Sequence, residues 1–535
     1  MLGDGQRDAR IPVRGRLRRG DRAGVGTVRS TRTGEHRRRL RNQHPRARGA
    51  HRRAHRFFRA ARVRSHQAGW AASTEPRHVA GPGRIWVPRR DRLPRGAAPY
   101  DRLVSNPEIS IRVRICFFNR SYWPDVAATG QLLTELAEDL VASHGCEVSV
   151  VAGRPLTGST GAGGGMPWWR LVGRETHNGV RILRANGTRL RPRRFAGRAL
   201  NYVSYFLSAA VASLAVKKPD IVVSLTDPPI VGLLALWTAR RTGAKFVFLC
   251  EDIFPEVAVL LEDFHNDAVN RTLDRVNRYL LAHADAVVAL GERMQRRLVE
   301  EKGADPRTIS IVHNWADCEA IAPASKDNAF ARAHGLAGQF VVMHSGNIGL
   351  SQNLDVVLDA AGRLRDRPNL VFAFVGDGAR RQALETSAAS RGLDNVRFFP
   401  YQPKDRLDDS FATADVFIVS LKPGIEGYIV PSKVYGILAA GRPFIAAVDP
   451  SCEAAAIARE HRCGVLATPG DADALAARVL ALYENRAETD AMGRRAREAA
   501  WQFDRRRAVK AYHDLFVSLP GVARVNSPVS REARV

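Results

Sequence analysis

Short apolar segments alternate with amphipathic helical segments along most of this chain, and this alternation constrains the fold more than any other feature. The first unit joins a strand-like run over residues 112–118 (RVRICFF) to a helical pattern over 130–142 and a second run over 147–152. The runs are apolar at nearly every position, which is typical of parallel strands covered on both faces. The pattern predicts an α/β protein with doubly wound parallel sheets.

The alternation falls into two series, separated by small, polar and charged residues over 322–337. The remaining strand-like runs are at 221–225, 246–250, 286–290 and 309–313 in the first series, and at 340–345, 371–375, 396–399, 416–420, 444–447 and 464–467 in the second. We predict a Rossmann-like domain over residues 109–325, another over 326–520 and a frayed tail over 521–535. Ligands bind beyond the carboxyl ends of parallel strands, so the chemistry is expected in the loops that follow those runs.

Residues 1–108 differ in composition from the rest of the chain. They contain 28 arginines, no lysine and 8 acidic residues, a net charge of +20 that leaves only +8 for residues 109–535. Without helical or strand periodicity, the segment cannot bury enough apolar surface to offset chain entropy. We predict a disordered, dispensable Arg-rich extension and interpret it as non-native sequence upstream of a start near residues 104–111. The alternative is an arm that binds RNA or a membrane.

Two features bear on the cellular compartment. The six cysteines are scattered without a C-x-x-C pair, which argues against zinc ribbons, and buried free thiols fit a reducing cytoplasm. Residues 199–216 form a stretch of 18 uncharged residues between Arg198 and Lys217. Its Asn, Ser and Tyr side chains leave three interpretations open: a half-buried helix, a helix on a membrane surface, or a membrane-spanning helix.

Turns that follow the predicted strands carry candidate donor-binding residues. A glycine at such a turn lets backbone N–H groups approach a phosphate at a helix N-terminus. A proline and a serine suit the start of a helix, so Lys433 projects from a first turn, where an ammonium can meet a diphosphate. A glycine at such a turn can instead serve close packing, and Lys433 can instead be a solvated helix lysine. The candidates are Thr129, Gly130, Gly346, Asn347, Gly376, Asp377, Pro431, Ser432 and Lys433.

The order of these motifs resembles the family 4 glycosyltransferases of GT-B fold, closest to the branch that builds capsule, O-antigen and colanic-acid-type polysaccharides. The resemblance covers residues 111–515. The motifs that carry it are Tyr122-x-Pro124 with Thr129-Gly130, Asp227-Pro228-Pro229, EDIFPE at 251–256, HNWAD at 313–317, SGNIG at 345–349, VGDG at 375–378, and Pro431-Ser432-Lys433 with AGRP at 440–443.

The resemblance implies retaining transfer of a sugar from a UDP- or GDP-linked donor to a lipid-linked or glycan acceptor. It places the donor mainly on the second domain, the acceptor on the first, and a cleft between the two domains, which face each other. It implies no metal or other cofactor, no nucleic-acid partner, and a cytoplasmic enzyme in peripheral contact with the inner face of the plasma membrane. The one Asp-x-Asp sequence, at 471–473, is interpreted as a helix N-cap instead of a metal site.

The chain departs from the family pattern at two places. When it is aligned on the sequence AAGRP, Tyr428 and Gly436 stand where the family has two glutamates, and Glu426 is the candidate substitute. Asn347 and Gln352 stand where the family has an arginine and a lysine. Both departures remove expected contacts with the ribose and the diphosphate of the donor.

These departures make Lys433 the expected main cation for the diphosphate. Asp252, at the end of a first-domain strand, and Glu426 complete the set of catalytic candidates. Two other functions stay open. One is a sugar-nucleotide 2-epimerase, which shares the two-domain architecture, and the other is a nucleic-acid-binding protein that acts through the Arg-rich segment.

Overall fold

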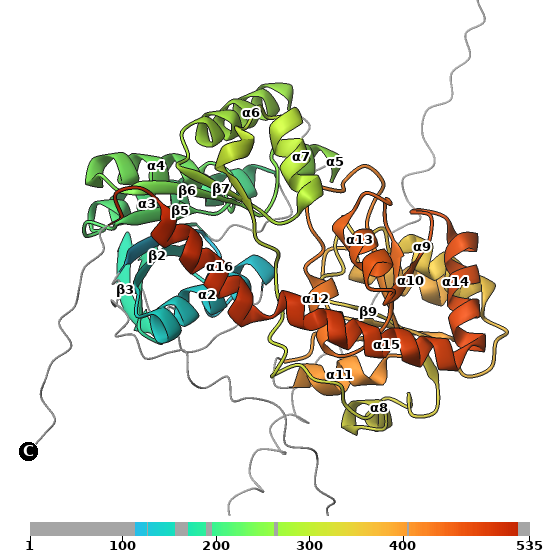
Figure 1. Ribbon diagram of the computed structural model, residues 1–535. Helices are drawn as coiled ribbons and strands as arrows, with labels where there is room; N and C mark the ends of the chain where they lie inside the picture. The colour runs from blue at the N-terminus through green and yellow to red at the C-terminus, as the bar shows by residue number, and fades with distance from the viewer. Residues whose placement is uncertain are drawn as a thin grey trace, which may run out of the picture. The chain divides into compact units, whose positions relative to one another are not determined.

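The computed structural model describes residues 113–522, except residue 126 and residues 156–169, 189–194, 262–265 and 404–405. The predicted extension over 1–108 and nearly all of the predicted tail over 521–535 lie outside the described residues. The described chain forms two sheets, each covered by helices (Figure 1). We call each sheet with its helices a domain, first and second in chain order.

The first sheet has eight strands in the order β3-β4-β2-β1-β5-β6-β7-β8, and its pairs are parallel except β3 with β4. Its strands are β1 (Arg114–Phe118), β2 (Glu147–Gly153), β3 (Val172–His177), β4 (Val180–Ala185), β5 (Ile221–Ser224), β6 (Lys245–Cys250), β7 (Ala286–Ala289) and β8 (Ile309–Ile311). Its helices are α2 (Ala128–His144), α3 (Phe195–Leu214), α4 (Val231–Thr242), α5 (Glu256–Leu260), α6 (Asp267–Ala282) and α7 (Glu292–Glu300).

The second sheet has six parallel strands in the order β11-β10-β9-β12-β13-β14. Its strands are β9 (Phe340–Ser345), β10 (Leu370–Val375), β11 (Val396–Phe399), β12 (Val416–Ser420), β13 (Phe444–Ala447) and β14 (Gly464–Leu466). The following helices are α8 (Ala329–Ala333), α9 (Asp355–Arg363), α10 (Arg381–Ser390), α11 (Leu407–Thr413), α12 (Lys433–Ala439), α13 (Glu453–Glu460), α14 (Ala472–Glu484), α15 (Arg486–Ala500) and α16 (Arg505–Ser518).

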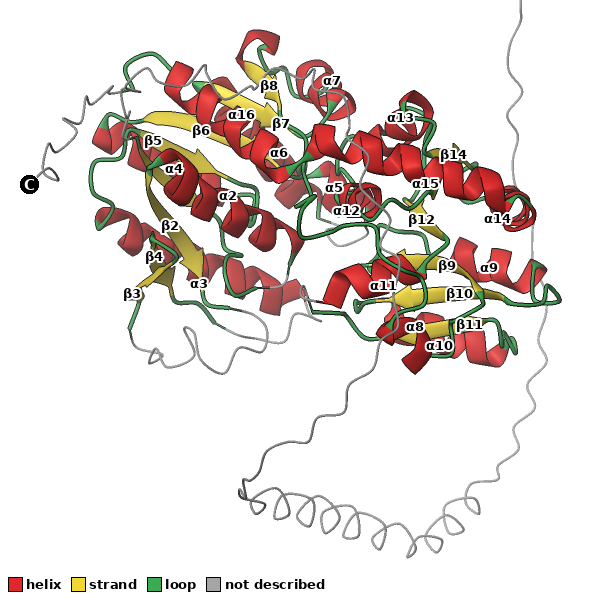
Figure 2. Cartoon of the chain, turned by 60° about the horizontal axis from the view of Figure 1, so that its bottom comes forward, coloured by secondary structure: helices red, strands yellow, loops and turns green. Residues whose placement is uncertain are grey.

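Continuous apolar strands explain why helices cover both faces of these sheets (Figure 2). Along β9, Phe340 and Val342 belong to one buried cluster and Val341 and Met343 to another. Successive side chains of a strand point to opposite faces, so a strand without polar residues needs apolar cover on each side. The predicted α/β fold with doubly wound parallel sheets is confirmed.

A β-hairpin, β3–β4, was not predicted from the sequence. Its strands are antiparallel and joined by Asn178 and Gly179, which have φ of 46° and 81°. Both values lie in the left-handed region that a tight two-residue hairpin turn requires, and Asn-Gly is its preferred sequence. A search for continuous apolar runs passes over β3 because that strand reads VGRETH, but the Asn-Gly pair was a usable signal.

Helix α16 corrects the predicted extent of the second domain, 326–520. Its side chains Ala508, Val509, Tyr512 and Phe516 lie in the buried core of the first sheet, beside α2 (Figure 1). The chain therefore returns to the first domain after α15. The 3.6-residue periodicity of a helix shows which face is buried but not which sheet buries it.

Two further expectations concern compartment and membrane. All six cysteines are free and buried, although burial was expected only for the three in or beside apolar strand-like runs. In the parts of the chain that the structure describes, no helix is long and apolar enough to cross a bilayer.

Candidate active site

Two adjoining cavities, of about 320 Å³ and about 1010 Å³, lie where strand ends of the first domain face the second domain. The smaller cavity is bounded mainly by the loop after β6 and by α2, and the larger one by the turns after β9 and β10 and the start of α12. Both are lined by residues of both domains. The residues that line both cavities are Ala128, Thr129, Leu132, Ile429, Val430 and Ser432.

Most of the candidate donor-binding residues line the larger cavity. Thr129 belongs to the first turn of α2, and the others belong to strand-end turns and to the start of α12. The ones at the larger cavity are Thr129, Gly346, Asn347, Asp377, Pro431, Ser432 and Lys433.

Two candidate glycines, Gly130 and Gly376, line neither cavity. A Cβ added to Gly130 would meet the backbone at Ser121 and Tyr122 at 3.3–3.4 Å. Gly376 has φ of 146°, and a Cβ there would stand 1.9 Å from the carbonyl oxygen of Gly346. These glycines allow close backbone approach, so they shape the cavity walls without contacting its contents.

Lys433 is an unpaired cation at the larger cavity. Its Nζ lies 3.3 Å from Nε2 of His344, and no carboxylate forms an ion pair with it among the described residues. Burial lowers the pKa of Lys433 to about 7. Burial, followed by the charge of Lys433, holds the pKa of His344 well below its usual range, so the imidazole is neutral. An anion bound in this cavity would raise the pKa of Lys433 again and favour the ammonium form, which has no carboxylate partner among the described residues.

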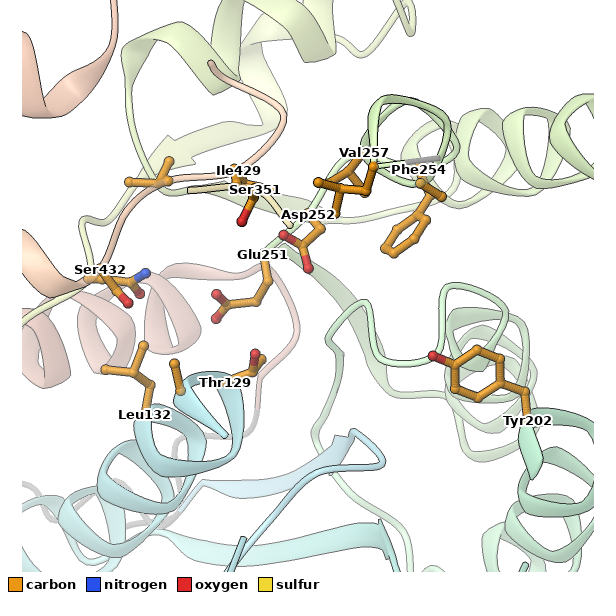
Figure 3. A pocket seen from close by; sticks show the side chains of 15 residues that line it. Thr129, Leu132, Tyr202, Glu251, Asp252, Phe254, Val257, Ser351, Ile429 and Ser432 are labelled. Atoms are coloured by element: carbon orange, nitrogen blue, oxygen red, sulfur yellow. The ribbon is translucent and has the colours of Figure 1, made fainter. Parts of the chain in front are cut away.

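Glu251 and Asp252 place two carboxylates at the smaller cavity, directly after β6. Figure 3 shows both side chains pointing into the space between Thr129, Ser432 and Tyr202. Burial, and then the charge of Asp252, raises the pKa of Glu251 to about 8. Burial, and then the charge of Asp227, raises the pKa of Asp252 to about 7.

Asp252 was predicted from the sequence as a catalytic candidate, and Glu251 was not. The strand-end rule that selected Asp252 applies equally to its neighbour, which comes first after the strand. Neither carboxylate has a hydrogen-bond or ion-pair partner among the described residues. Both acids are thus available to a ligand and titrate close to neutral pH.

Glu426, the third catalytic candidate, lies outside both cavities. Its carboxylate accepts from Arg297 Nη2 at 3.0 Å, and its carbonyl accepts from Arg297 Nε at 2.7 Å. Arg297 belongs to α7 of the first domain. The pair is buried, so Glu426 links the loop before α12 to the first domain instead of facing the cavities.

The same loop has two more ties to the first domain. The backbone N–H of Ile253, directly after the two acids, donates to the carbonyl of Tyr428 at 2.9 Å. The hydroxyl of Tyr428 donates to Glu301 at 2.7 Å. The loop that leads to Lys433 is therefore hydrogen-bonded to the loop that carries Asp252. This bond joins a wall of the larger cavity to a wall of the smaller one.

The positions that depart from the family pattern have identifiable roles in this structure. Gln352 accepts from the N–H of Gly349 at 3.0 Å and holds the turn after β9. Gly436 lines the larger cavity, and Tyr428 belongs to the tied loop.

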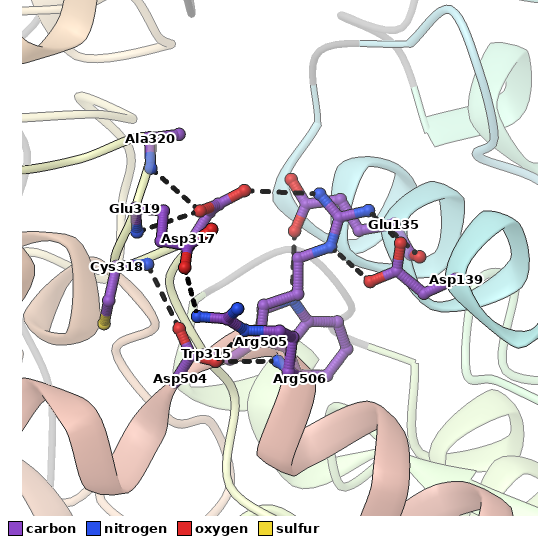
Figure 4. A network of polar contacts seen from close by, with 10 residues as sticks. All are labelled: Glu135, Asp139, Trp315, Asp317, Cys318, Glu319, Ala320, Asp504, Arg505 and Arg506. Carbon is purple, nitrogen blue, oxygen red and sulfur yellow. Dashed lines mark hydrogen bonds and ion pairs between the residues drawn. The ribbon is translucent and has the colours of Figure 1, made fainter. Parts of the chain in front are cut away.

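The chain passes between the domains twice, at residues 315–318 and at residues 504–505. These two segments are bonded to each other beside the larger cavity (Figure 4). Arg505 binds Asp139 of α2 with two contacts of 2.6 Å, and Trp315 Nε1 donates to Glu135 at 2.9 Å. Asp504 accepts from the backbone N–H of Cys318 at 3.3 Å. Trp315, Glu135 and Arg505 also line the cavity, a role that the sequence analysis did not assign to them.

Asp471 has the predicted capping role. Its carboxylate accepts from the N–H groups of Asp473 and Ala474 at the start of α14, and Asp473 pairs with Arg363. Searched over the described residues, the chain contains no cluster of three or more His, Cys, Asp or Glu side chains placed to hold a metal ion.

Two doubly wound domains with strand-end cavities shared by both are the architecture of the GT-B class of glycosyltransferases. Comparisons with known proteins agree with this assignment. Residues 128–315 match the family model described as glycosyl transferase 4-like domain, and residues 326–499 match glycosyl transferases group 1.

Curated relatives include the glycosyltransferase named WbjE of Pseudomonas aeruginosa, 30% identical over 55% of this chain and 72% of that protein. WcaI of Escherichia coli (strain K12), named as a colanic acid biosynthesis glycosyl transferase, is 27% identical over 62% of this chain and 82% of its own length. The chain therefore belongs to the group 1, or family 4, glycosyltransferases.

Solved structures show the same fold. Anabaena Alr3699/HepE, in complex with UDP-glucose, has a TM-score of 0.58 at 16% identity, over 76% of this chain and 100% of that one. WaaG, a glycosyltransferase involved in lipopolysaccharide biosynthesis, has a TM-score of 0.56 at 14% identity over the same shares. The predicted GT-B fold is confirmed.

Proposed function

We propose that this glycosyltransferase moves a sugar from a nucleoside-diphosphate sugar, UDP- or GDP-linked, to a lipid-linked or glycan acceptor in cell-surface polysaccharide biosynthesis. The observation that carries the proposal is the unpaired Lys433 at one cavity beside the free acids Glu251 and Asp252 at the adjoining one. The names of WcaI and WaaG support the pathway class, and the HepE complex supports the donor class.

In the proposed reaction, the bond between the anomeric carbon and the diphosphate oxygen breaks, and its electron pair stays on the diphosphate. The charge on that diphosphate grows as the bond breaks, so Lys433 stabilises the transition state more than the bound donor. The acceptor hydroxyl forms its bond to the anomeric carbon on the face that the diphosphate leaves, which retains the configuration.

The proton of the acceptor hydroxyl moves to Asp252 in this proposal. A carboxylate whose pKa is about 7 is partly ionised at neutral pH and is still basic enough to accept a proton. Glu251 lies beside it and holds the acceptor by hydrogen bonding.

Product analysis with and without an acceptor tests this function. The donors are UDP- and GDP-sugars, and the acceptor is a lipid extract that contains polyprenyl-linked sugars. Transfer requires both substrates and gives a glycosylated lipid with retained configuration. An isomeric nucleotide sugar formed from the donor alone would instead identify the 2-epimerase.

Transfer is expected to be independent of metal ions. The proposed offset for the diphosphate charge is Lys433, and we assign no acid pair to hold a cation beneath it. Turnover in the presence of EDTA should therefore equal turnover with Mg²⁺ or Mn²⁺. A loss of activity in EDTA that either ion restores would reject this expectation.

Binding of UDP should draw a proton onto the protein at mildly alkaline pH. Lys433, with a pKa of about 7, is mostly neutral at pH 8 in the empty cavity. A neighbouring diphosphate raises this pKa, so binding at pH 8 takes up about 0.9 proton. Calorimetry in two buffers of different ionisation enthalpy measures the uptake, and Lys433→Met should lower it to what Glu251 and Asp252 take up. Equal heats in both buffers for the unchanged protein would contradict the assignment.

We further propose that the protein works in the cytoplasm, in peripheral contact with the inner face of the plasma membrane, because a lipid-linked acceptor is anchored there. No nucleic acid takes part in this function. Carbonate or high-salt washing of membranes should release a peripheral protein, whereas a spanning segment would survive both washes.

A further inference from the structure

Helix α3 exposes a stripe of large apolar side chains. The five residues recur at intervals of three and four, which places them on one face of the helix, and each is between 44% and 62% exposed. Exposure of large apolar side chains to water costs free energy, and contiguous apolar surfaces of soluble proteins usually mark an interaction site. The stripe residues are Leu200, Val203, Leu207, Val211 and Leu214.

The opposite face of α3 fixes the helix on the first sheet. Tyr205, Ala209 and Ala212 are buried in the core of that domain. The helix is therefore anchored by one apolar face while it presents a second one outward. A simple surface helix of a soluble domain would carry polar side chains there.

Exposed aromatic and basic side chains also lie on two nearby helices. On α4, which packs against α3, Trp237 is exposed and the Arg241 guanidinium lies 5.3 Å from its ring centroid. On α6, which packs against α4, exposed Tyr279 accepts a hydrogen bond of 2.9 Å from Arg240.

The charged residues near α3 in the sequence are basic. Lys217 and Lys218 are exposed directly after the helix, and the sequence contains no acidic residue between Glu175 and Asp220. Basic residues beside apolar ones, with Trp and Tyr at the margin, match the chemistry of an anionic lipid surface.

We infer that the stripe of α3, together with Trp237, Tyr279 and the flanking basic side chains, rests on an anionic bilayer. We call this surface the α3–α4 face. The apolar stripe enters the boundary between headgroups and acyl chains, and the basic residues meet the lipid phosphates. Tyr202 of the same helix lines the smaller cavity, so this helix links the docked surface to the cavity that holds the two free acids.

This inference rests on the proposed function only in its choice of a lipid-linked acceptor. Binding to lipid needs no turnover. If vesicles bind and no sugar is transferred, the proposed function fails and the α3–α4 face stands. If transfer to a short water-soluble acceptor proceeds and vesicles do not bind, the inference fails and the function stands.

A fluorescent label on α3 tests the contact directly in the full chain. All six native cysteines are buried, so an exposed Val211→Cys variant reacts selectively with a polarity-sensitive dye. Mixed phosphatidylglycerol–phosphatidylcholine vesicles should shift its emission to the blue, whereas phosphatidylcholine alone should shift it little. The control is Trp501→Cys, an exposed apolar position of the second half of the chain, which should show no shift.

Vesicle sedimentation tests the energetics with Leu207→Glu/Leu214→Glu, which places two charges in the stripe. Binding to anionic vesicles should weaken by about tenfold or more, because acidic side chains oppose both the apolar and the electrostatic attraction. Turnover with a water-soluble acceptor should stay unchanged. The Arg-rich segment is present in every variant. High salt screens its electrostatic attraction to anionic vesicles, so sedimentation is measured at high salt.

Two outcomes would overturn the inference. One is equal high-salt sedimentation of the unchanged protein and the double glutamate variant, with no blue shift at Val211→Cys. The other is a blue shift without vesicles that grows with protein concentration, accompanied by a dimer in sedimentation velocity. That result would assign the α3–α4 face to a second copy of the chain.

Discussion

Lys433→Ala is expected to lower turnover by roughly 10²–10³-fold, the scale of removing one preorganised charge-stabilising donor. The ammonium has no ion-pair partner among the described residues, so the growing negative charge of the leaving diphosphate is its expected counter-charge. The loss should appear mainly in kcat, because the interaction strengthens as the bond breaks. Steady-state kinetics with a saturating acceptor measures it.

Three comparisons make this result interpretable. Lys433→Arg should recover only part of the activity, since guanidinium and ammonium differ in shape and hydration. Lys422→Ala removes a lysine of the same loop that lines neither cavity and should leave turnover unchanged. The melting temperature of Lys433→Ala should stay close to that of the unchanged protein. Near-normal turnover would remove Lys433 from the mechanism, and unfolding would assign it a structural role.

Asp252→Asn is expected to lower transfer by roughly 10²–10⁴-fold, the contribution of a positioned general base. Glu251→Gln should retain more activity, because Glu251 positions the acceptor in our proposal. The readout is the rate of product formation at saturating donor and acceptor. Glu300→Gln, at an exposed acid of α7 that lines neither cavity, serves as the matched control.

The pH profile distinguishes a base from a merely structural acid. Asp252 accepts a proton only when ionised, and the pair has pKa values of about 7 and about 8. Transfer should rise with pH between about 6 and about 9 and be lost as the pH falls, with both acids titrating as a coupled pair. Glu251→Gln should leave the lower midpoint nearly unchanged, since burial and the charge of Asp227 set the pKa of Asp252. A flat profile in the unchanged protein would exclude this role.

The apolar patterning of the sequence was sufficient to predict the sheets. Strands β9, β11, β12 and β13 begin and end at the predicted residues. Parallel strands buried on both faces have no solvent side, so their sequences are apolar throughout and their limits are clear. The rule that ligands bind beyond strand ends then located Asp252 and several donor-binding candidates at the cavities, and the helix start at Pro431-Ser432 located Lys433.

The same patterning fails where an element is half exposed or packs outside its own series. Strand β3 is an edge strand with polar residues, and only Asn178-Gly179 marked its hairpin. Helix α16 follows the second series in the chain, yet its apolar face belongs to the first core. A helical pattern defines a face that must be covered, and the partner that covers it is a property of the assembled fold.

Glu426 shows why alignment to a family pattern could not place a side chain. Its partner Arg297 lies 129 residues earlier in the sequence, on α7 of the other domain. Only the packing of the two domains brings the guanidinium of Arg297 to the carboxylate of Glu426, and this ion pair keeps the carboxylate out of the cavities.

The sequence by itself determined the two α/β domains, the strand ends at which ligands bind, and Lys433 and Asp252 as candidates, but it did not select Glu251. The tertiary structure decided which of them face a shared cavity and what charge they carry. A lysine or a carboxylate has its ordinary pKa in water, and only burial among side chains distant in sequence moves these pKa values toward neutrality, because desolvation disfavours the charged form of each group.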